Sequence, residues 1–443
     1  MIQNKKQLIM NGSTEVFQQK RKDILTMFEA ALEAVNPSTA VSQMFSNKTI
    51  KYEDKSINLD DFKNIYVVGF GKASVGMAQA LFEIVSVSQA VLITNDPAAK
   101  LAYENVEIIV GGHPLPTQES VRGAKKILDI VDKCSEDDIL IVLISGGGSA
   151  LFCYPRVSLQ DMQQTTDVLM KAGADINELN TVRKHLSYVK GGRLATKTKA
   201  TIVSLIISDI IDDPLEFIAS GPTVADSTTF ADALQIIHNY DLENKIPTQV
   251  LDTLLKGKQG HIQETPKEND SCFTKVHNSI IASNKQACVQ AAKIATKLGY
   301  EAQVHSTMVH GEAKILGPKL VDLAHSSAAN KKCVLISGGE PTVTIHGTGK
   351  GGRNQELILS MIPALHKTTI VAASFGTDGI DGNSDAAGAI ADGATLTKAI
   401  EKKMDYEVFL KNNNSYEYFH ALHDVIITGP TGTNVMDIQI VIP

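Results

Sequence analysis

The sequence lacks the features that would place the protein in a membrane or on a nucleic acid. Its 443 residues contain no apolar run of the ~18 residues that a membrane-spanning helix needs. Acidic residues (49) outnumber lysine and arginine (42), so the net charge is −7 and no basic footprint for DNA or RNA is present. The amino-terminal stretch carries basic charge without an apolar h-region, so we expect no secretory signal.

Cysteine is scarce and irregularly spaced. The sequence has five cysteines, an odd number, and no two of them form a CxxC pair. A zinc site built on cysteine is therefore not expected. Thiols without a disulfide pattern are typical of a reducing compartment, so we expect a cytoplasmic protein.

The chain is too long for one hydrophobic core and predicts two domains, since domains usually contain ~100–200 residues. Apolar runs rich in β-branched residues alternate with helical segments, at residues 64–68, 90–94, 106–110, 138–145 and 201–208. Strands that alternate with helices in this way indicate a parallel, Rossmann-like α/β sheet. A polar stretch at 243–275 precedes a second series that starts at 276. We therefore expect an N-terminal α/β domain at 1–242 and a C-terminal α/β domain at 243–443.

Glycine-rich loops follow several of the expected strands, where open α/β folds bind their ligands. The first loop contains Gly69, Gly71 and Lys72, and glycine at such a turn lets backbone N–H groups converge on an anion. A dinucleotide-binding fingerprint is one alternative, with Asp96 after the next strand. The spacing to Gly76 is not GxGxxG, however, and the lysine is better suited to a phosphate or a carboxylate. A tight turn with a solvated lysine is the other alternative.

A second loop contains three glycines between two serines: Ser145, Gly146, Gly147, Gly148 and Ser149. It is not a GxSxG nucleophile elbow, because Leu151 stands where the last glycine belongs. No Walker A motif occurs in the chain either. The loop therefore predicts an anion cradle rather than a nucleophilic serine.

The densest glycine cluster lies in the second half of the chain. It starts at Ser337, Gly338, Gly339 and Glu340 and ends at Arg353 and Asn354. An arginine among glycines, just before an expected helix, can present its planar guanidinium to a pair of phosphate oxygens. A surface hairpin with a solvated arginine is the alternative.

Carboxylates occupy two further loops after expected strands. Asp209 and Asp378 are each the first carboxylate after a strand, and Asp381 and Asp385 follow Asp378 closely. Such groups either help to bind Mg²⁺ or accept a proton. Asx-turns, in which Asp and Asn only close tight turns, are the alternative. The sequence leaves both the metal and the base role open for Asp209 and Asp378.

Eight segments resemble the class II glycerate kinases (glycerate 2-kinases), in order and from about Ile24 to Val441. Five lie in the first half: GFGKAS (69–74), GGHPLPTQES (111–120), LISGGGSALF (143–152), NTVRKHLSYVKGGRLA (180–195) and SDIIDDPLEFIASGPT (208–223). Three resemble the family's carboxy-terminal MOFRL domain, at about 332–438: SGGEPTVTIHGTGKGGRNQE (337–356), GTDGIDGNSDAAGA (376–389) and TGPTGTNVMDI (428–438). Pro341 departs from the family, which usually has a second threonine there, and this puts a hydroxyl role at that position in doubt.

The resemblance implies ATP-dependent phosphorylation of D-glycerate at its 2-hydroxyl, with Mg²⁺. It also implies two α/β domains with the active site in the cleft between them. The essential lysine and arginine of the family fall on Lys72 and Arg353, and its important aspartates on Asp209 and Asp378.

Together, the residues and the resemblance predict a division of roles. We expect Lys72 and Arg353 to neutralise the transferred phosphoryl group. One of Asp209 and Asp378 would accept the proton of the attacking hydroxyl, and the other would help to hold Mg²⁺. The side chains and loops expected to contact phosphate or substrate are Gly71, Ser145, Gly146, Gly147, Gly148, Ser149, Arg183, Ser337, Gly338, Gly339, Glu340 and Asn354, with Arg183 on the substrate carboxylate.

Three other functions stay open at this point. An NAD(P)H-dependent hydroxypyruvate reductase would use the loop at Gly69–Gly76, and a non-catalytic sugar-acid binding protein would keep the glycine loops without needing the charges. A kinase for a related small hydroxy acid is the third. The expected partners are ATP and D-glycerate, and a homodimer is compatible with the sequence.

Overall fold

The computed structural model describes residues 1–52, 55–327 and 332–443. The chain forms two compact units. Pro37–Ile281 make up one of them, which we call the central unit. The other, which we call the terminal unit, joins Met1–Asn36 to Ala282–Pro443. The central unit is therefore inserted between two parts of the terminal unit in the sequence.

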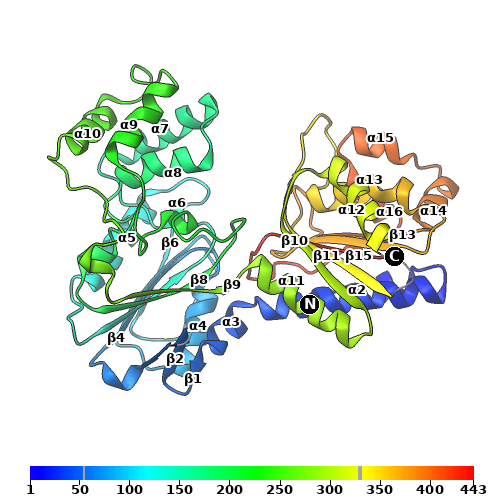
Figure 1. Cartoon of the computed structure of the whole chain (residues 1–443), viewed down its shortest axis with the longest axis horizontal. Helices are drawn as coiled ribbons and strands as arrows, with labels where there is room; N and C mark the ends of the chain where they lie inside the picture. The colour runs from blue at the N-terminus through cyan, green and yellow to red at the C-terminus, as the bar shows by residue number, and fades with distance from the viewer. Residues whose placement is uncertain (53–54, 328–331) are drawn as a thin grey trace. The chain divides into compact units, whose positions relative to one another are not determined.

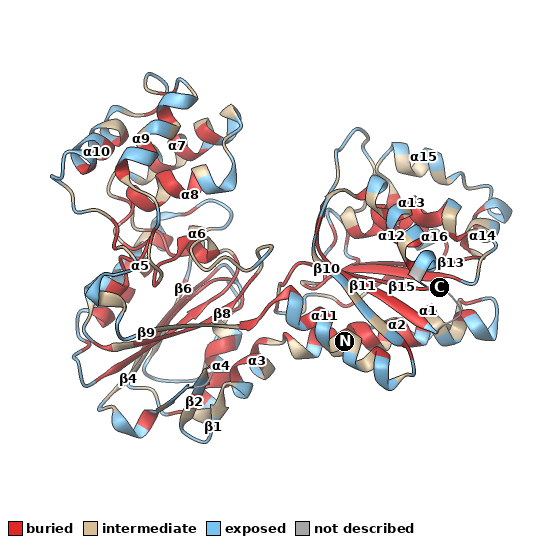
Figure 2. Cartoon of the chain, in the orientation of Figure 1, coloured by how far each residue is buried: buried red, intermediate tan, exposed pale blue. Residues whose placement is uncertain are grey.

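The central unit is built on a six-stranded sheet with the strand order β6-β5-β4-β7-β8-β9 (Figure 1). The strands β4 to β8 pair in parallel, as the alternation with helices predicts. Their bounds are β4 (Ile65–Phe70), β5 (Gln89–Thr94), β6 (Val106–Val110), β7 (Ile139–Ile144), β8 (Thr201–Ile207) and β9 (Val276–Ala282). Every residue of β7 is buried, which is expected for a central parallel strand that is covered on both faces (Figure 2).

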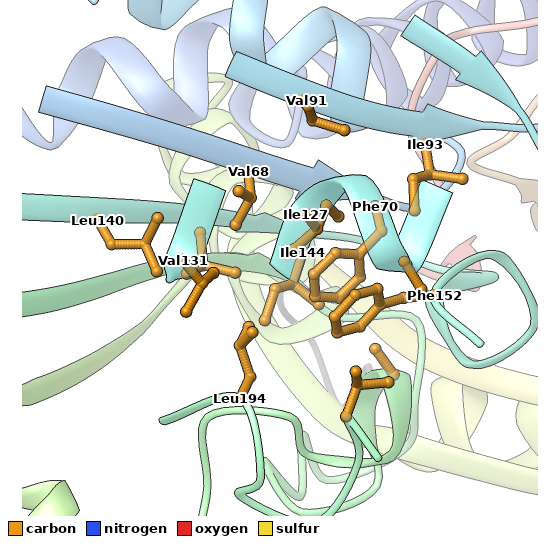
Figure 3. Close-up of a cluster of buried hydrophobic side chains, with 14 of the residues drawn as sticks. Val68, Phe70, Val91, Ile93, Ile127, Val131, Leu140, Ile144, Phe152 and Leu194 are labelled. Carbon is orange, nitrogen blue, oxygen red and sulfur yellow. The ribbon is translucent and has the colours of Figure 1, made fainter. Parts of the chain in front are cut away.

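The main core of this unit lies between the sheet and its covering segments (Figure 3). Helices α4 (Ser74–Ile84) and α5 (Gln118–Val131) connect strands, and the core includes Ile127 and Val131 of α5. The ring of Phe70, at the end of β4, stacks on the ring of Phe152 with their centroids 4.3 Å apart. Because Phe152 directly follows the short helix α6 (Gly148–Leu151), this stack holds the triple-glycine segment against the end of β4.

A second apolar cluster joins four helices, α7 (Leu159–Ala172), α8 (Ile176–His185), α9 (Phe230–Asn239) and α10 (Thr248–Lys258). The remaining elements of the central unit are α3 (Pro37–Gln43), the small antiparallel sheet of β1 (Phe45–Ser46), β2 (Thr49–Tyr52) and β3 (Lys55–Asn58), and the 3-10 turns η1 (Leu59–Asp61), η2 (Ala195–Lys197), η3 (Ile218–Ser220) and η4 (Ser271–Phe273).

The terminal unit contains a second six-stranded sheet, with the order β10-β11-β15-β12-β13-β14. β10 and β11 are parallel and the other pairs are antiparallel. The strands are β10 (Glu301–Glu312), β11 (Cys333–Thr342), β12 (Val371–Gly376), β13 (Gly388–Asp392), β14 (Val425–Ile426) and β15 (Asp437–Ile442). The helices are α1 (Lys5–Met10), α2 (Glu15–Ala34), α11 (Asn284–Lys297), α12 (Ala313–Ser327), α13 (Arg353–Leu365), α14 (Thr395–Glu401), α15 (Tyr406–Lys411) and α16 (Ser415–Ala421).

Helices cover both faces of this second sheet. The helices α12 and α13 lie on one face, and α2 and α11 lie on the other (Figure 1). Phe28 of α2 packs on Phe375 of β12 with ring centroids 4.1 Å apart. Helix α2 is thus part of the core that the carboxy-terminal half of the chain builds.

The units divide the chain elsewhere than at 242/243, where the sequence places the boundary. β9 belongs to the central sheet instead of starting the second one. The polar stretch after 242 contributes α10, whose Val250 and Leu254 are fully buried together with Ile246. Val250 and Leu254 lie four positions apart on one face of α10, so an apolar helix face is hidden in a stretch whose average composition is polar.

Arg21 joins α2 to distant parts of the terminal unit through two ion pairs. Its guanidinium is fully buried and pairs with Asp392 at 2.7 Å and with Asp424 at 2.5 Å. Arg21→Met should lower the free energy of unfolding by about 3–5 kcal/mol, because it leaves two buried carboxylates without their guanidinium partner. Urea unfolding measures this, with the exposed neighbour Lys22→Met as the control. Equal effects of the two substitutions would contradict the prediction.

Candidate active site

Three loops of the central unit meet at one edge of its sheet. Lys72 follows β4, the glycines at 146–148 follow β7, and Asp209 follows β8. The strands β4, β7 and β8 are neighbours and parallel, so their carboxyl ends lie side by side. The fold thus brings together three of the groups that the sequence predicts for the site. We call this set the glycine-loop cluster.

Close backbone contacts lock these loops to one another. The amide of Lys72 donates to the carbonyl of Gly146 at 2.9 Å, and the amide of Ala73 donates to Oγ of Ser145 at 3.0 Å. A Cβ atom at Gly146 would overlap the Asp209 carboxylate, and one at Gly71 would overlap Ser145. The glycines therefore allow the Lys72 loop and the Asp209 carboxylate to approach the triple-glycine loop from two sides.

Lys72 keeps its charged end available. Its side chain is exposed and makes no hydrogen bond or ion pair with any residue that the structure describes. Gly147, in the left-handed region with φ 81°, lies between the ring of His113 and the Lys72 stem, so a Cβ there would come within 3.0–3.5 Å of both. Burial, and then the charge of Lys72, lower the pKa of His113. The lowered pKa favours the neutral form of His113.

The same contacts weigh against a dinucleotide at this loop. A pyrophosphate would need free backbone amides at the start of α4. The amides of Lys72, Ala73 and Ser74 already donate to Gly146, Ser145 and Gly71 within the chain. The glycine at 71 is also explained by its contact with Ser145 rather than by the close approach of a ligand.

Buried polar groups support the far end of the triple-glycine segment. Oγ of Ser149 lies 2.9 Å from Oγ of Ser220, which donates to Asn180. Lys190, which the sequence prediction did not include, donates from Nζ to the carbonyls of Ser149 at 2.6 Å and Phe152 at 3.2 Å. Burial lowers the pKa of Lys190 to about 8, against an opposing effect of Cys153. Lys190 therefore fixes the short helix that carries the glycines.

Arg183 lies beside this support. It lines a small pocket together with Ser149, Cys153 and Lys190. Arg183 is largely buried, and burial lowers its pKa. Within the described chain it has no carboxylate partner, which leaves its guanidinium available for an anionic ligand.

A second cluster lies in the terminal unit, where β11, β15 and β12 run side by side. In this register Asp437, the first residue of β15, stands between Gly339 of β11 and Gly376 of β12. Arg353, the first residue of α13, donates to both Asp437 oxygens, at 2.5 and 3.1 Å. Its remaining arm donates to Glu340 at 2.7 Å. We call these residues the arginine cluster.

Asp437 is a residue that sequence reasoning missed. It is 1% exposed, and burial raises its pKa to about 7 even though the Arg353 guanidinium acts to lower it. The motif at 428–438 contained it, but its position in the middle of the sheet depends on the antiparallel pairing of a strand that the sequence did not predict.

Several of the expected anion-binding glycines have structural partners instead. Gly338 and Gly339 lie inside β11 and not in a loop, and a Cβ at Gly339 would overlap the backbone of Val309. The amides of residues 346–348 and 350 donate to side chains of the asparagines at 412–414, and the amide of Gly351 to that of Asn383. The glycine-rich segment is thus a loop that asparagines hold in place.

The other predicted residues of this unit have different local partners. Asn354 donates to the buried Asp381 from its backbone amide and from its side chain, at 3.0 and 3.2 Å, so Asp381 caps this helix. Ser337 is buried in β11, and its hydroxyl has no hydrogen-bond partner among the described residues. Asp378 is half-buried and accepts from the amide of Ile380 at 3.1 Å, as in an Asx-turn.

Metal binding by the chain alone is not supported within the described residues, where no group of three or more His, Cys, Asp or Glu side chains is placed to hold an ion. Asp209 and Asp378 are instead single carboxylates at strand ends. That arrangement fits Mg²⁺, which is usually held by one or two carboxylates together with waters and phosphate oxygens.

Among the described helices, none has both the length and the apolar content that crossing a membrane requires.

The chain is similar to known proteins over nearly its whole length. A domain of unknown function (DUF4147) matches residues 23–255, and the MOFRL family matches residues 333–437. The chain is 42% identical to a glycerate 2-kinase of Pyrococcus horikoshii, covering 94% of this chain and 96% of that protein. It is 37% identical to a D-glycerate 2-kinase of Thermotoga maritima, with 93% and 97% covered. A solved structure of a glycerate kinase from T. maritima matches with a TM-score of 0.86 at 35% identity, covering 96% of this chain and 99% of that one.

The fold and the two clusters define a two-unit α/β protein whose charged groups gather on glycine-rich strand ends. With matches over nearly its whole length, the chain belongs to the class II glycerate kinase family.

The raised pKa of Asp437 predicts a specific dependence of stability on pH. The native state holds this proton up to pH about 7, whereas an unfolded aspartate releases it near ~3.9. The native state then binds more protons between these values, so its stability should fall as pH rises through that range. Urea unfolding from pH 4.5 to 8 should show this fall in the wild type relative to Asp437→Asn. If the wild type instead gained stability relative to Asp437→Asn as the pH rises, the effect of Arg353 on the pKa of Asp437 would outweigh the effect of burial.

Proposed function

We propose that the protein transfers the γ-phosphoryl group of ATP to the 2-hydroxyl of D-glycerate. The observation that carries this proposal is the meeting of Lys72, the triple-glycine loop and Asp209 at one sheet edge. Phosphoryl transfer needs cations, backbone that cradles anions and a carboxylate that orients the nucleophile. The kinase relatives, which match almost end to end, support the same reaction.

In this proposal Lys72 and Asp209 have complementary roles. The Lys72 ammonium, which pairs with none of the described residues, neutralises charge on the transferred phosphoryl group. The Asp209 carboxylate orients the attacking hydroxyl and accepts its proton. The contact between Asp209 and Gly146 supports this role, because it keeps the carboxylate beside the loop in which the phosphate oxygens would lie.

With Asp209 as the base, Mg²⁺ would be held by Asp378 together with phosphate oxygens, and it would neutralise charge on the transferred group. Arg353 is assigned to the phosphoryl group as well. Its guanidinium already pairs with Asp437 and Glu340. A phosphate would have to replace Glu340, because the Glu340 side chain is the more exposed of the two partners. Asp437 would then be a positioning residue, because it orients the guanidinium and does not contact the substrate.

Arg183 is assigned to the carboxylate of the acceptor. Its largely buried guanidinium without a carboxylate partner, next to Ser149 and Lys190, supports that role. A related small hydroxy acid would satisfy the same group, so acceptor choice depends on the rest of the substrate. Five free cysteines support a cytoplasmic location. A homodimer stays a prediction.

The decisive experiment supplies purified protein with ATP, Mg²⁺ and D-glycerate. ADP release should depend on D-glycerate, and phosphorus NMR should identify 2-phosphoglycerate. A panel of other hydroxy acids tests the acceptor range. The occupied amides at the start of α4 predict no oxidation of NADH or NADPH with hydroxypyruvate. Reduction of hydroxypyruvate without ADP release would overturn the proposal.

Gly146→Ala tests the contact that carries the proposal. Its Cβ would push the Asp209 carboxylate away from the loop. Displacement of a catalytic group by about 1 Å can cost ~10² in rate, so kcat should fall by roughly that factor. Gly76→Ala, in the helix α4, is the matched control, because its Cβ would make only an ordinary 3.7 Å contact with Pro37. Equal kcat values for the two variants would show that the position of Asp209 beside the loop does not matter for catalysis.

A further inference from the structure

The central unit contains a second concave site whose residues belong to none of the loops discussed above. A cavity of about 340 Å³ opens between the segment that follows α8, the segment that follows α10, and Arg156. Its basic lining consists of Arg156, Arg193, Lys197 and His261. Arg193 lies in the family-like motif at 180–195, and phosphoryl transfer gives it no role.

Contacts with neighbouring residues hold both arginines in the lining of the cavity. Arg193 is 6% exposed and donates from Nη2 to the carbonyl of Gln263 at 3.0 Å, while its buried Nε has no partner in the described chain. Arg156 donates from Nε to Ser187 at 3.2 Å and lies over the ring of Tyr188, 4.4 Å from its centre.

Among the described residues, no acidic side chain lines the cavity. The acids that act on Arg193 are Asp226 and Glu264. Asp226 pairs with Lys184 at 3.2 Å, and Glu264 pairs with His185 at 3.0 Å. Burial and the neighbouring Arg156 lower the pKa of Arg193 to about 10, although both acids raise it.

We propose that this cavity binds the phosphate group of a small phosphorylated metabolite, separately from the loops that carry Lys72 and Asp209. Two planar guanidinium forks with a lysine offer more donors than one carboxylate can accept, and they match the oxygens of a phosphate dianion. A nucleic acid would need an extended basic face, and the chain carries a net charge of −7. The site does not depend on which reaction the protein catalyses.

Calorimetric titration of the full-length protein tests this site, with inorganic phosphate and 2-phosphoglycerate as probes and with chloride holding the ionic strength constant. Arg156→Gln should weaken phosphate binding at least tenfold, because it removes a charged donor. Lys197→Gln should weaken it about threefold, since this lysine is exposed. Lys199→Gln, an exposed lysine two positions away that does not line the cavity, is the matched control and should bind as the wild type does.

The Lys72→Gln variant distinguishes phosphate binding in the cavity from phosphate binding at the glycine-loop cluster. The affinity of the cavity for phosphate should be unchanged in this variant. The proposal is overturned if Arg156→Gln and Lys197→Gln both bind like the wild type, or if Lys72→Gln alone abolishes binding. Failure of 2-phosphoglycerate to displace inorganic phosphate would contradict the assignment to a phosphorylated metabolite. Because Lys197 is exposed, its variant keeps the test valid even if Arg156→Gln does not fold.

Discussion

The arrangement of the glycine-loop cluster depends on one steric constraint, the missing side chain at Gly146. Asp209 can lie against the triple-glycine loop only because no Cβ atom fills that space. On its other side, the loop accepts a hydrogen bond from the amide of Lys72 through the carbonyl of the same glycine. A cation-bearing loop and a carboxylate-bearing loop are therefore set at a fixed spacing by a residue that has no functional group of its own.

Much of the central unit could be predicted from sequence. The strands β4 to β8 follow from continuous apolar runs between helices, and their parallel pairing follows from the βαβ alternation. The groups Lys72, Gly146 and Asp209 follow from their positions just after strands. The limits of the two units could not be predicted in this way. The polar average of the stretch after residue 242 hides the helical spacing of Val250 and Leu254, and β9 joins the sheet from a distance in the sequence.

In the terminal unit, the sequence alone does not predict the contacts of the glycine-rich segment. Arg353 among glycines resembles a free phosphate fork, yet the structure pairs it with a carboxylate 84 residues further along the chain. Likewise, asparagines at 412–414 occupy the amides that the glycine-rich loop would offer to an anion. Both contacts depend on tertiary structure and on antiparallel strand order, neither of which has a local signal. Glycine content alone does not distinguish a ligand cradle from a tightly packed loop.

The pairing of Arg21 with Asp424 also constrains how the protein is made. The two residues are 403 positions apart, and the whole central unit is encoded between them. At ribosomal rates of about 5–20 residues per second, α2 waits roughly 20–80 s before its carboxylate partner exists. The central unit, by contrast, has all its strands long before then. The ion pairs that bury Arg21 can therefore form only after the whole central unit has been synthesised.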